Sequence, residues 1–507
     1  MKPKMSGQHY VGIDLGTVNS SLAYADDDGN VTISRGSQGR SLLPTTVSFS
    51  GKEKYVGYEA LEGEYDFDAP DSVFYFKRLM GTDFVRVFDS VSYTPVELSA
   101  LVITKIAKIY EGNTNMRIGK AVITVPGDYT DAEKDATIAA AKMAGVDQVA
   151  LINESVAAAI SALTFSGTMS EQKVIVYDLG GGTLDVTVVK VNDNQFTVLS
   201  DESSKDLGGK DWDLQLGTII QKKILDSCGL TADDVESDPN FRKFVMAEAE
   251  RKKVLLESRV RAVGTIDLRG EKIKYTVSRQ EFEESTTWLM MKSIEMVGYA
   301  LRNAGLKMSD IDNILLVGGS TLMPQVRRSL EEAFPSQEII SHDPENDVAM
   351  GAAIYARSKF GPNPNIKVTL VSTRTIGVKA GIDGVERVCN IIFRNTPLPI
   401  DKKVQFIPKR DDQKILDINL YESMAKPNEA FIDDDEAKLI SKNEIKLNGK
   451  ISRGKTKITI RFMQDIDGRL SITVQCNDQI TECRTSDMKE ITIDDISNSK
   501  SKMGGII

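Results

Sequence analysis

The pattern of apolar positions changes character once along the chain. Up to about residue 360, short apolar runs alternate with longer stretches of helical periodicity. One run, at residues 122–125, is ended by Pro126 and predicts a buried strand. The helix expected after this strand has Thr130 as its N-cap, with Glu133 completing a capping box, and it ends at Gly145. Such alternation of strands and helices is typical of a layered α/β architecture.

A breaker-rich stretch at 361–365, Gly-Pro-Asn-Pro-Asn, separates this part from the rest. Beyond it, hydrophobic residues recur with period two and Asn-Gly and Asp-Gly turns intervene, which predicts an antiparallel β domain. The stretch from about residue 498 is polar and then glycine-rich, so we expect it to fray. The predicted units are an α/β domain at 1–361, a linker at 362–367 and a β-rich domain at 368–507.

Composition mainly excludes classes of function. The net charge of −10 argues against nucleic acid or an anionic membrane as partner. No window is apolar enough to span a bilayer, and no apolar run precedes the first expected strand, so a cytoplasmic location is expected. The 4 cysteines lack Cys-x-x-Cys spacing, and there are only 2 histidines. The chemistry must therefore lie with carboxylates, lysines and backbone amides.

Two loops repeat one pattern. An apolar strand ends in Asp14 and continues Leu-Gly-Thr-Val-Asn, and another ends in Asp178 and continues Leu-Gly-Gly-Gly-Thr-Leu-Asp. Glycines let backbone amides approach phosphate oxygens, and acids at strand ends can hold a hydrated magnesium ion. Either loop alone could be a simple hairpin turn, but the matched pair favours a phosphate site. A third strand opens into Gly318-Gly319-Ser320 before a helix, which suits close approach to a nucleoside.

Together these loops resemble the actin–sugar kinase–chaperone ATPase superfamily, and further motifs resemble its seventy-kilodalton heat-shock chaperones of the DnaK type. The motifs follow in order along nearly the whole chain: Ile13-Asp-Leu-Gly-Thr, Phe76-Lys-Arg-Leu, Val122-Ile-Thr-Val-Pro, Ile152-Asn-Glu-Ser-Val-Ala-Ala-Ala, Asp178-Leu-Gly-Gly-Gly-Thr, Leu207-Gly-Gly-Lys-Asp, Val317-Gly-Gly-Ser-Thr, Asp343-Pro, Phe393-Arg-Asn-Thr-Pro-Leu-Pro and Asp465-Ile-Asp-Gly-Arg-Leu. The resemblance implies a two-lobed actin-like ATPase domain, with ATP or ADP and Mg²⁺ as cofactors. It implies slow hydrolysis that controls a β-sandwich-like domain clamping unfolded polypeptide, with a J-domain co-chaperone and a nucleotide-exchange factor as partners.

The resemblance also assigns site residues. Those implied to act in catalysis or to hold magnesium through water are Asp14 and Asp178 (metal) and Lys77, Glu154, Asp178, Thr183 and Asp185 (catalysis). Those implied to bind nucleotide are Gly16, Thr17, Val18, Asn19, Gly180, Gly181, Gly182, Thr183, Gly208, Gly209, Glu250, Lys253, Glu257, Gly318, Gly319, Ser320 and Glu345. Lys77 would stabilise the γ-phosphate, since its positive charge offsets the negative charge spread over the phosphoryl group in transfer. Without the resemblance, the sequence favours Lys77 as a solvated basic residue beside Arg78. Glu154 could instead be an acid favoured by a helix N-terminus.

A helix expected at 242–259 places Glu250, Lys253 and Glu257 on one face, where the resemblance puts the adenosine. A solvated salt-bridge stripe is the alternative interpretation. Two positions depart from the family: Glu257 stands where a small serine is usual, and Leu322 where an arginine often packs on the adenine. With Val254 on the same face, adenine would lie between aliphatic side chains without a cation–π contact.

The organisation departs from the family as well. We expect the helical lid that usually follows the β domain to be missing, so that bound peptide leaves faster. The family linker is a leucine run with an acid, whereas residues 366–371 alternate and resemble a strand. Two other functions stay open: a nucleotide-gated scaffold or holding protein that barely hydrolyses ATP, and a small-molecule kinase on the same core.

Overall fold

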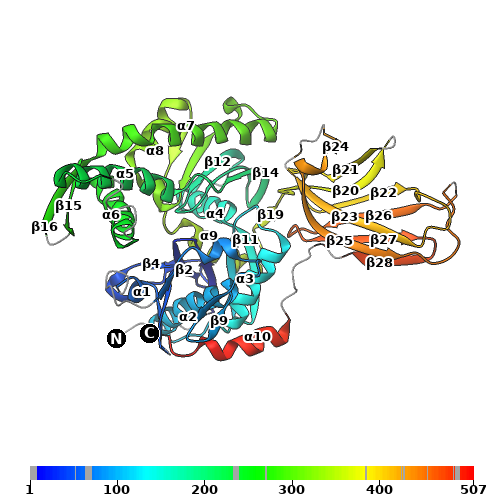
Figure 1. Ribbon diagram of the computed structural model, residues 1–507, viewed down its shortest axis with the longest axis horizontal. Coiled ribbons are helices and arrows are strands. Elements are labelled where there is room, and N and C mark those ends of the chain that lie inside the picture. Colours follow the sequence, from blue (N-terminus) through cyan, green and yellow to red (C-terminus); the bar gives the residue numbers. More distant parts are fainter. Residues whose placement is uncertain are drawn as a thin grey trace.

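The computed structural model describes residues 8–506, apart from 52, 63–70, 169, 232–238, 269–270, 383–384, 424, 426–428, 454, 484 and 486–491. Figure 1 shows a large α/β body of two lobes and, to its right, a smaller β body. The predicted fold class, a two-lobed α/β ATPase-type body followed by a β-sandwich-like domain, is confirmed. The domain limits at 361 and 367 stay predictions.

The N-terminal lobe is built on a mixed sheet in the order β11-β10-β1-β2-β3, with β4 paired to β2. Its strands are β1 (Tyr10–Asp14), β2 (Asn19–Ala25), β3 (Val31–Ile33), β4 (Leu42–Pro44), β10 (Lys120–Val125) and β11 (Gln148–Asn153). Helices α2 (Pro95–Thr114) and α3 (Asp131–Met143) pack on one face. The predicted capping box at the start of α3 is confirmed, since Glu133 N donates to Thr130 and the Glu133 carboxylate accepts from Thr130 N.

The C-terminal lobe has a second mixed sheet, in the order β18-β17-β12-β13-β14-β19. Its strands are β12 (Gln172–Leu179), β13 (Leu184–Asn192), β14 (Gln195–Ser204), β17 (Asn313–Val317), β18 (Glu338–Ile340) and β19 (Lys367–Thr369). Its helices and hairpin are α5 (Gly209–Cys228), α6 (Pro239–Ser258), β15 (Arg261–Leu268), β16 (Glu271–Ser278), α7 (Arg279–Ala304) and α8 (Pro324–Ala333).

Two helices, α4 (Glu154–Ser166) and α9 (Asp347–Phe360), lie between the two lobe sheets and pack against each other. Their crossing is close: a Cβ at Gly351 would sit 1.7 Å from the carbonyl oxygen of Ala157. Gly12 in β1 meets the same constraint, with a Cβ 2.2 Å from Ala353 N. Glycine at these two positions therefore sets how near the lobes approach each other.

The N-terminal lobe also contains several shorter strands and helices outside its main sheet. These are η1 (Ser37–Gly39), β5 (Val47–Ser50), β6 (Glu53–Val56), α1 (Tyr58–Glu62), β7 (Asp71–Val73), η3 (Phe76–Leu79), β8 (Arg86–Phe88) and β9 (Val91–Tyr93). In the C-terminal lobe, η5 (Met308–Asp310) and η6 (Gly319–Leu322) flank β17. Among the described residues no helix is both long and apolar enough to cross a bilayer.

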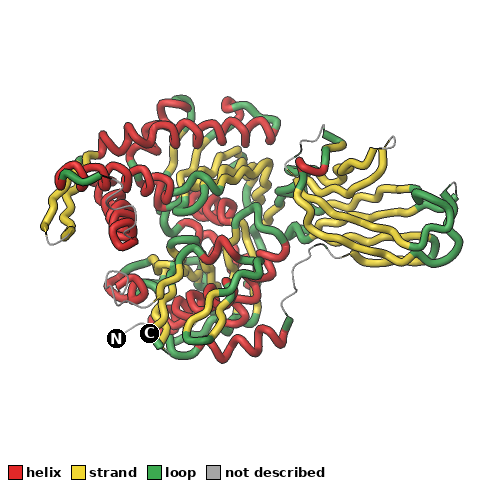
Figure 2. Tube along the Cα trace, in the orientation of Figure 1, coloured by secondary structure: helices red, strands yellow, loops and turns green. Residues whose placement is uncertain are grey.

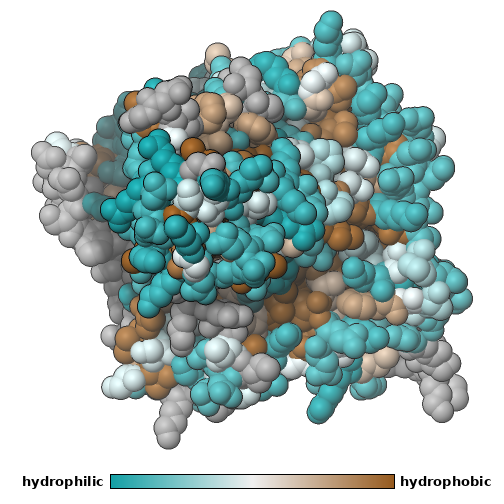
Figure 3. All heavy atoms as spheres, turned by 90° about the vertical axis from the view of Figure 1, so that its right-hand side faces the viewer, coloured by the Kyte–Doolittle hydropathy of each residue, from teal (hydrophilic) through white to brown (hydrophobic). Residues whose placement is uncertain are grey.

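The β domain is a sandwich of two antiparallel sheets, ordered β24-β21-β20-β23-β25 and β22-β26-β27-β28. Its elements are β20 (Thr375–Ile382), β21 (Val385–Ile392), β22 (Ile400–Phe406), β23 (Ile415–Ser423), β24 (Phe431–Ile432), η7 (Asp434–Glu436), β25 (Lys438–Lys446), β26 (Ile458–Gln464), β27 (Leu470–Cys476) and β28 (Gln479–Cys483). The predicted alternation is confirmed in β26, where every second residue is buried in the inter-sheet core. Figure 2 shows this body as strands joined by loops, with a short helical turn, and the face of the molecule in Figure 3 is mainly hydrophilic with hydrophobic residues among them.

Within the stretch at 366–371, the strand predicted from its alternation is found at Lys367–Thr369. β19 adds to the edge of the C-terminal lobe sheet, running parallel to β14 with Phe196 opposite Val368. Ile366, Val368 and Leu370 pack on the core between the lobes, while Lys367 faces solvent. The connection to the β domain is therefore part of a sheet in the α/β body.

The expectation that the chain frays from about residue 498 is wrong. Residues 493–503 form α10 (Ile493–Lys500) and η8 (Ser501–Met503), and they lie against the N-terminal lobe, as the red helix in Figure 1 shows. Met503 and Ile506 are buried in that lobe's core. The polar, glycine-rich composition suggested fraying. The segment is ordered instead by contacts with residues that lie far away in the sequence, and composition does not reveal these contacts.

Candidate functional site

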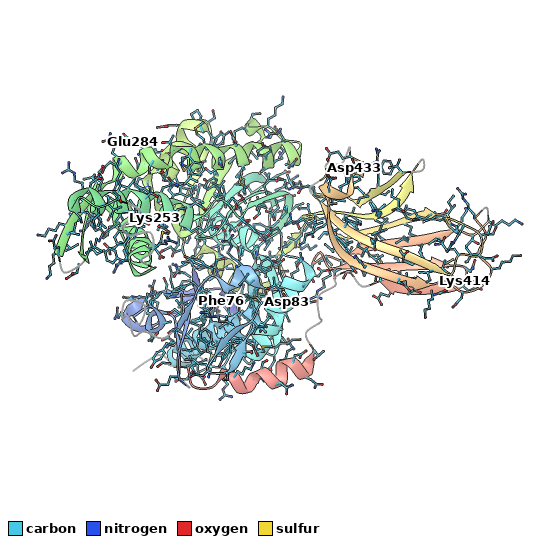
Figure 4. All side chains as sticks on the ribbon, in the orientation of Figure 1. Phe76, Asp83, Lys253, Glu284, Lys414 and Asp433 are labelled. Carbon is cyan, nitrogen blue, oxygen red and sulfur yellow. The ribbon has the colours of Figure 1, made fainter. Side chains whose placement is uncertain are left out.

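A cavity of about 230 Å³ opens between the two lobes. Figure 4 places Phe76 in the N-terminal lobe and Lys253 in the C-terminal lobe, on the two sides of this cleft. The residues predicted for the site that line it are Asp14, Gly16, Thr17, Val18, Asn19, Lys77, Glu154, Asp178, Gly180, Gly181, Gly182, Thr183, Asp185, Glu250, Lys253, Glu257, Gly318, Gly319, Ser320 and Glu345. Gly208 and Gly209 do not line it. The chain thus brings most of the set together, while the role of each residue stays a prediction.

The two matched loops face each other across the cleft. They are the turns of two antiparallel hairpins, in which Asp14 pairs with Ser21 and Asp178 pairs with Asp185. A Cβ at Gly181 would lie 2.3 Å from a methyl carbon of Val18 in the opposite loop. Glycine at 181 is therefore required by the approach of the two loops, in addition to any contact with a ligand.

Gly208 and Gly209 lie behind the second loop. A Cβ at Gly208 would come within 2.4 Å of the carbonyl carbon of Gly182, so a side chain there would displace the loop. Gly209 begins α5, and its carbonyl oxygen accepts from Lys253 Nζ at 3.1 Å. These two glycines support the loop and the neighbouring lysine from outside the cavity.

Lys77 is buried and paired with Glu154. The short helix η3 is entered through Tyr75 with φ of 56°, and Phe76 is fully buried beneath it. Lys77 is only 4% exposed, and its Nζ lies 2.6 Å from Glu154 Oε1. The interpretation of Lys77 as a solvated surface residue is therefore wrong. Tyr129 holds the same turn, since its hydroxyl donates to the Lys77 carbonyl at 3.3 Å.

Electrostatics keep this lysine charged. Burial alone lowers the pKa of Lys77, but the nearby Glu154, followed by Tyr129 and Asp14, outweighs it and the net pKa is raised. Glu154 is also the first residue of α4, whose N-terminus is capped by the Asn153 side chain. The helix-terminus interpretation and the ion pair with Lys77 are thus compatible.

Three aspartates join Glu154 around this lysine. Burial, then Glu154, raises the pKa of Asp14 to about 6, although Thr124 Oγ1 donates to it at 2.8 Å. Burial raises the pKa of Asp185 to about 8, with Asp201 and Glu154 adding to it. Burial followed by Asp185 also raises the pKa of Asp178. Four carboxylates against one lysine leave the cleft short of positive charge, so it favours a cation.

These carboxylates fit a hydrated magnesium ion, which keeps most of its waters and uses few protein ligands. Among the described residues no group of three or more acidic, histidine or cysteine side chains is placed to hold a metal directly. Binding of the ion through water by Asp14 and Asp178 stays a prediction. Thr183 Oγ1 donates to Asp185 at 3.0 Å, which orients the carboxylate toward the loop.

At the other end of the cleft, α6 presents Glu250, Lys253 and Glu257. Lys253 Nζ pairs with Asp213 of α5 at 2.8 Å, so it bridges two helices and does not belong to a solvated stripe along one. Burial, then Glu345, raises the pKa of Glu257 to about 7. Val254 lines the cavity but Leu322 does not, so only one of the two predicted aliphatic neighbours of adenine borders it.

Sequence reasoning missed several residues that line the cleft. They are Leu42, Arg78, Pro126, Asp128, Tyr129, Glu133, Lys205, Pro344 and Val348. Asp128 pairs with Arg374 of the β domain at 3.0 Å, so the cleft wall extends to the domain interface. For Pro126, Asp128 and Tyr129 the signal was their place directly after the strand at 120–125, since loops at the carboxyl ends of strands gather at the ligand site in α/β folds.

Comparison with known proteins agrees with this geometry. The family model of the Hsp70 protein matches residues 10–503. The chain is 31% identical over 522 residues to "Chaperone protein DnaK" of Mycoplasmopsis agalactiae, covering 98% of this chain and 83% of the relative. It is 32% identical to the protein of the same name from Mycoplasmopsis pulmonis, covering 96% and 79%, and 32% identical to that of Ureaplasma urealyticum, covering 97% and 79%.

Proposed function

The chain belongs to the Hsp70 family, and from that premise we propose that it is an ATP-dependent molecular chaperone of the cytoplasm. ATP binding and hydrolysis in the cleft would control how the β domain holds an extended segment of unfolded polypeptide. The observation that carries the proposal is the buried pair of Lys77 and Glu154 among three aspartates, directly beneath two glycine loops.

Each group in the cleft has a task in phosphoryl transfer to water. Lys77 would place its charge against the γ-phosphate, where negative charge builds up in the transition state. Glu154 and Asp185 would orient the attacking water. Asp14 and Asp178 would hold a hydrated Mg²⁺, which when bound offsets the charge of the phosphates.

Backbone and polar groups would position the nucleotide. The amides of the two loops would contact phosphate oxygens, aided by the hydroxyls of Thr17 and Thr183. Glu250, Lys253 and Glu257 would contact the nucleoside beside the turn at Gly318. In this proposal the ion pair with Asp213 holds Lys253 in position for the nucleoside. A lysine that is already ordered loses less conformational entropy on binding.

The β domain would bind its client in an extended form, since such a segment satisfies its backbone by β-type pairing while pockets take alternate side chains. A J-domain co-chaperone and a nucleotide-exchange factor are proposed as further partners. Nucleotide state would reach the β domain through β19, which joins the cleft-bearing sheet, and through Arg374 and Asp128.

The test is the dissociation rate of a labelled unfolded peptide from the full chain in ATP and in ADP. We expect release to be faster in ATP. Equal release rates in both nucleotides, with tight peptide binding, would indicate a holding protein that works independently of nucleotide. That result would contradict the proposed control of peptide binding by ATP.

A further inference from the structure

The segment 492–506 follows the β domain in sequence but packs on the N-terminal lobe. Its helix is encoded locally: Thr492 and Asp495 form reciprocal hydrogen bonds at the start of α10, with acids in the first turn. α10 lies beside α3, and η8 lies against α2 (Figure 1). This segment therefore connects the β domain to the N-terminal lobe, whereas the linker strand β19 pairs with β14 of the C-terminal lobe.

Its polar anchor is Glu97 of α2, which is only 3% exposed. Glu97 Oε1 accepts from Ser499 Oγ and from Lys502 Nζ, each at 2.7 Å. Lys502 also donates to the carbonyl of Ser92 at 2.8 Å. The pKa of Glu97 is raised by burial, but the bonds from Lys502, Thr94 and Ser499 outweigh this and lower it overall. Glu97 is thus a buried charge that the segment helps to satisfy.

Beyond this anchor the segment contributes to the lobe's core and contacts the edge of one of its sheets. Met503 and Ile506 are 8% and 9% exposed and belong to the N-terminal core. Gly505 O accepts from Lys54 N at 3.1 Å, and Ile506 bridges Lys54 in parallel fashion at the edge strand β6. Lys108 Nζ donates to Ile506 O at 3.1 Å. The contact is a single β-bridge at the sheet edge, supported by two apolar anchors.

The β domain meets the same lobe on α3. Lys134 Nζ of α3 donates to the carbonyl oxygen of Asp467, in the turn at 465–470 of the β domain, at 2.9 Å. Arg469 pairs with Asp135 at 2.6 Å, and Leu470 N donates to Asp131 at 2.9 Å. α3 is therefore held by the β domain through these three contacts and by α10 packed beside it.

We infer that residues 492–506 are a strap, a second tether that holds the β domain on the N-terminal lobe, and that its release from Glu97 is what allows the β domain to leave α3. Without the strap, the β domain could swing away on β19 at the cost of the contacts on α3 and of the pairs Arg374–Asp128 and Arg394–Glu202. With the strap in place the β domain stays near α3 at high effective concentration, so lost contacts reform rapidly. The strap and the contacts on α3 then stabilise each other reciprocally.

Lys502→Glu in the full chain tests the strap, because it sets a second carboxylate against Glu97 without altering the N-terminal core. The control is Lys500→Glu, the same change at an exposed position of the same segment. Amide hydrogen exchange is measured over 492–506, β6, α3, the turn at 465–470 and, as a check of folding, β12. For Lys502→Glu we expect at least about tenfold faster exchange in all but β12. For Lys500→Glu we expect only a smaller change, confined to α10, because Lys500 ends that helix.

Three results would overturn the inference. Fast exchange of 492–506 in the unmodified chain would mean that the segment does not dock in solution. Faster exchange of the strap and β6 with α3 and the turn unchanged would mean that the strap does not hold the β domain. Unchanged exchange in Lys502→Glu would mean that Glu97 is not its anchor. If Lys502→Glu also speeds amide exchange in β12, the milder variant Ser499→Ala is used in its place. The same three outcomes then decide.

Discussion

Single residues show how far chemistry can be predicted without a fold. The glycine loops and their acids could be identified because amides, glycines and carboxylates have few other uses in that arrangement. Lys77 could not be assigned from its neighbours, since a lysine beside Arg78 is more often solvated. Only the burial of η3 against Glu154 decides between the two interpretations. Asp128 was missed because its partner, Arg374, lies 246 residues away.

Lys77→Ala should leave ATP binding nearly intact and slow hydrolysis by about two orders of magnitude or more, because the cation acts on charge that develops in the transition state. Single-turnover hydrolysis and nucleotide affinity are measured in parallel. Arg86→Ala is the control, an exposed cation of the same lobe that does not line the cleft. Equal losses of affinity and rate in Lys77→Ala would contradict the assigned role.

Glu257 should make stability depend on pH. Its pKa is raised to about 7 in the folded chain, from an ordinary value of 4.5. The stabilising contribution is therefore present below about pH 4.5 and is lost as the pH rises through 7. Glu257→Gln should match the unmodified chain at pH 5 and melt about 2 °C or more higher at pH 8. Glu250→Gln, at an exposed position of the same helix, is the control; a difference in melting temperature that does not grow with pH would refute this.

At the scale of elements, local patterns predicted local structure. The alternation at 366–371 predicted a strand, and the capping box predicted the start of α3, because both depend on neighbouring residues. The pairing of β19 with β14 was beyond prediction, since any edge strand could have received it. The strap was predicted to fray because its composition is polar and glycine-rich, while its order comes from Glu97 and Lys54 in the other lobe.

Lys367→Pro should detach β19 from the sheet. Lys367 N donates to Asn194 O at 2.9 Å, and proline removes this donor. Lys367→Ala keeps the amide and removes only an exposed side chain, so it is the matched control. We expect faster hydrogen exchange in residues 195–198 for the proline variant alone. The pairing would be shown unimportant if both variants exchanged alike.

At the scale of the whole molecule, the domain arrangement is what the sequence could not provide. The β domain is joined to the C-terminal lobe by β19 and by the buried pair of Arg394 and Glu202 at 2.7 Å, and to the N-terminal lobe through α3 and the strap. A peptide can change turnover only by as much as it shifts this docking equilibrium. Several independent contacts favour the docked arrangement, so a bound peptide should shift it little.

The most direct test of ATP-driven chaperone action is the rate of ATP turnover by the full chain, with and without saturating unfolded peptide. Lys77→Ala is run in parallel, and sugars are supplied as alternative phosphate acceptors. We predict slow hydrolysis to free phosphate, about a hundredfold or more above Lys77→Ala, raised by peptide but by less than about tenfold. Turnover no faster than that of Lys77→Ala, or phosphate recovered on a sugar, would contradict the account.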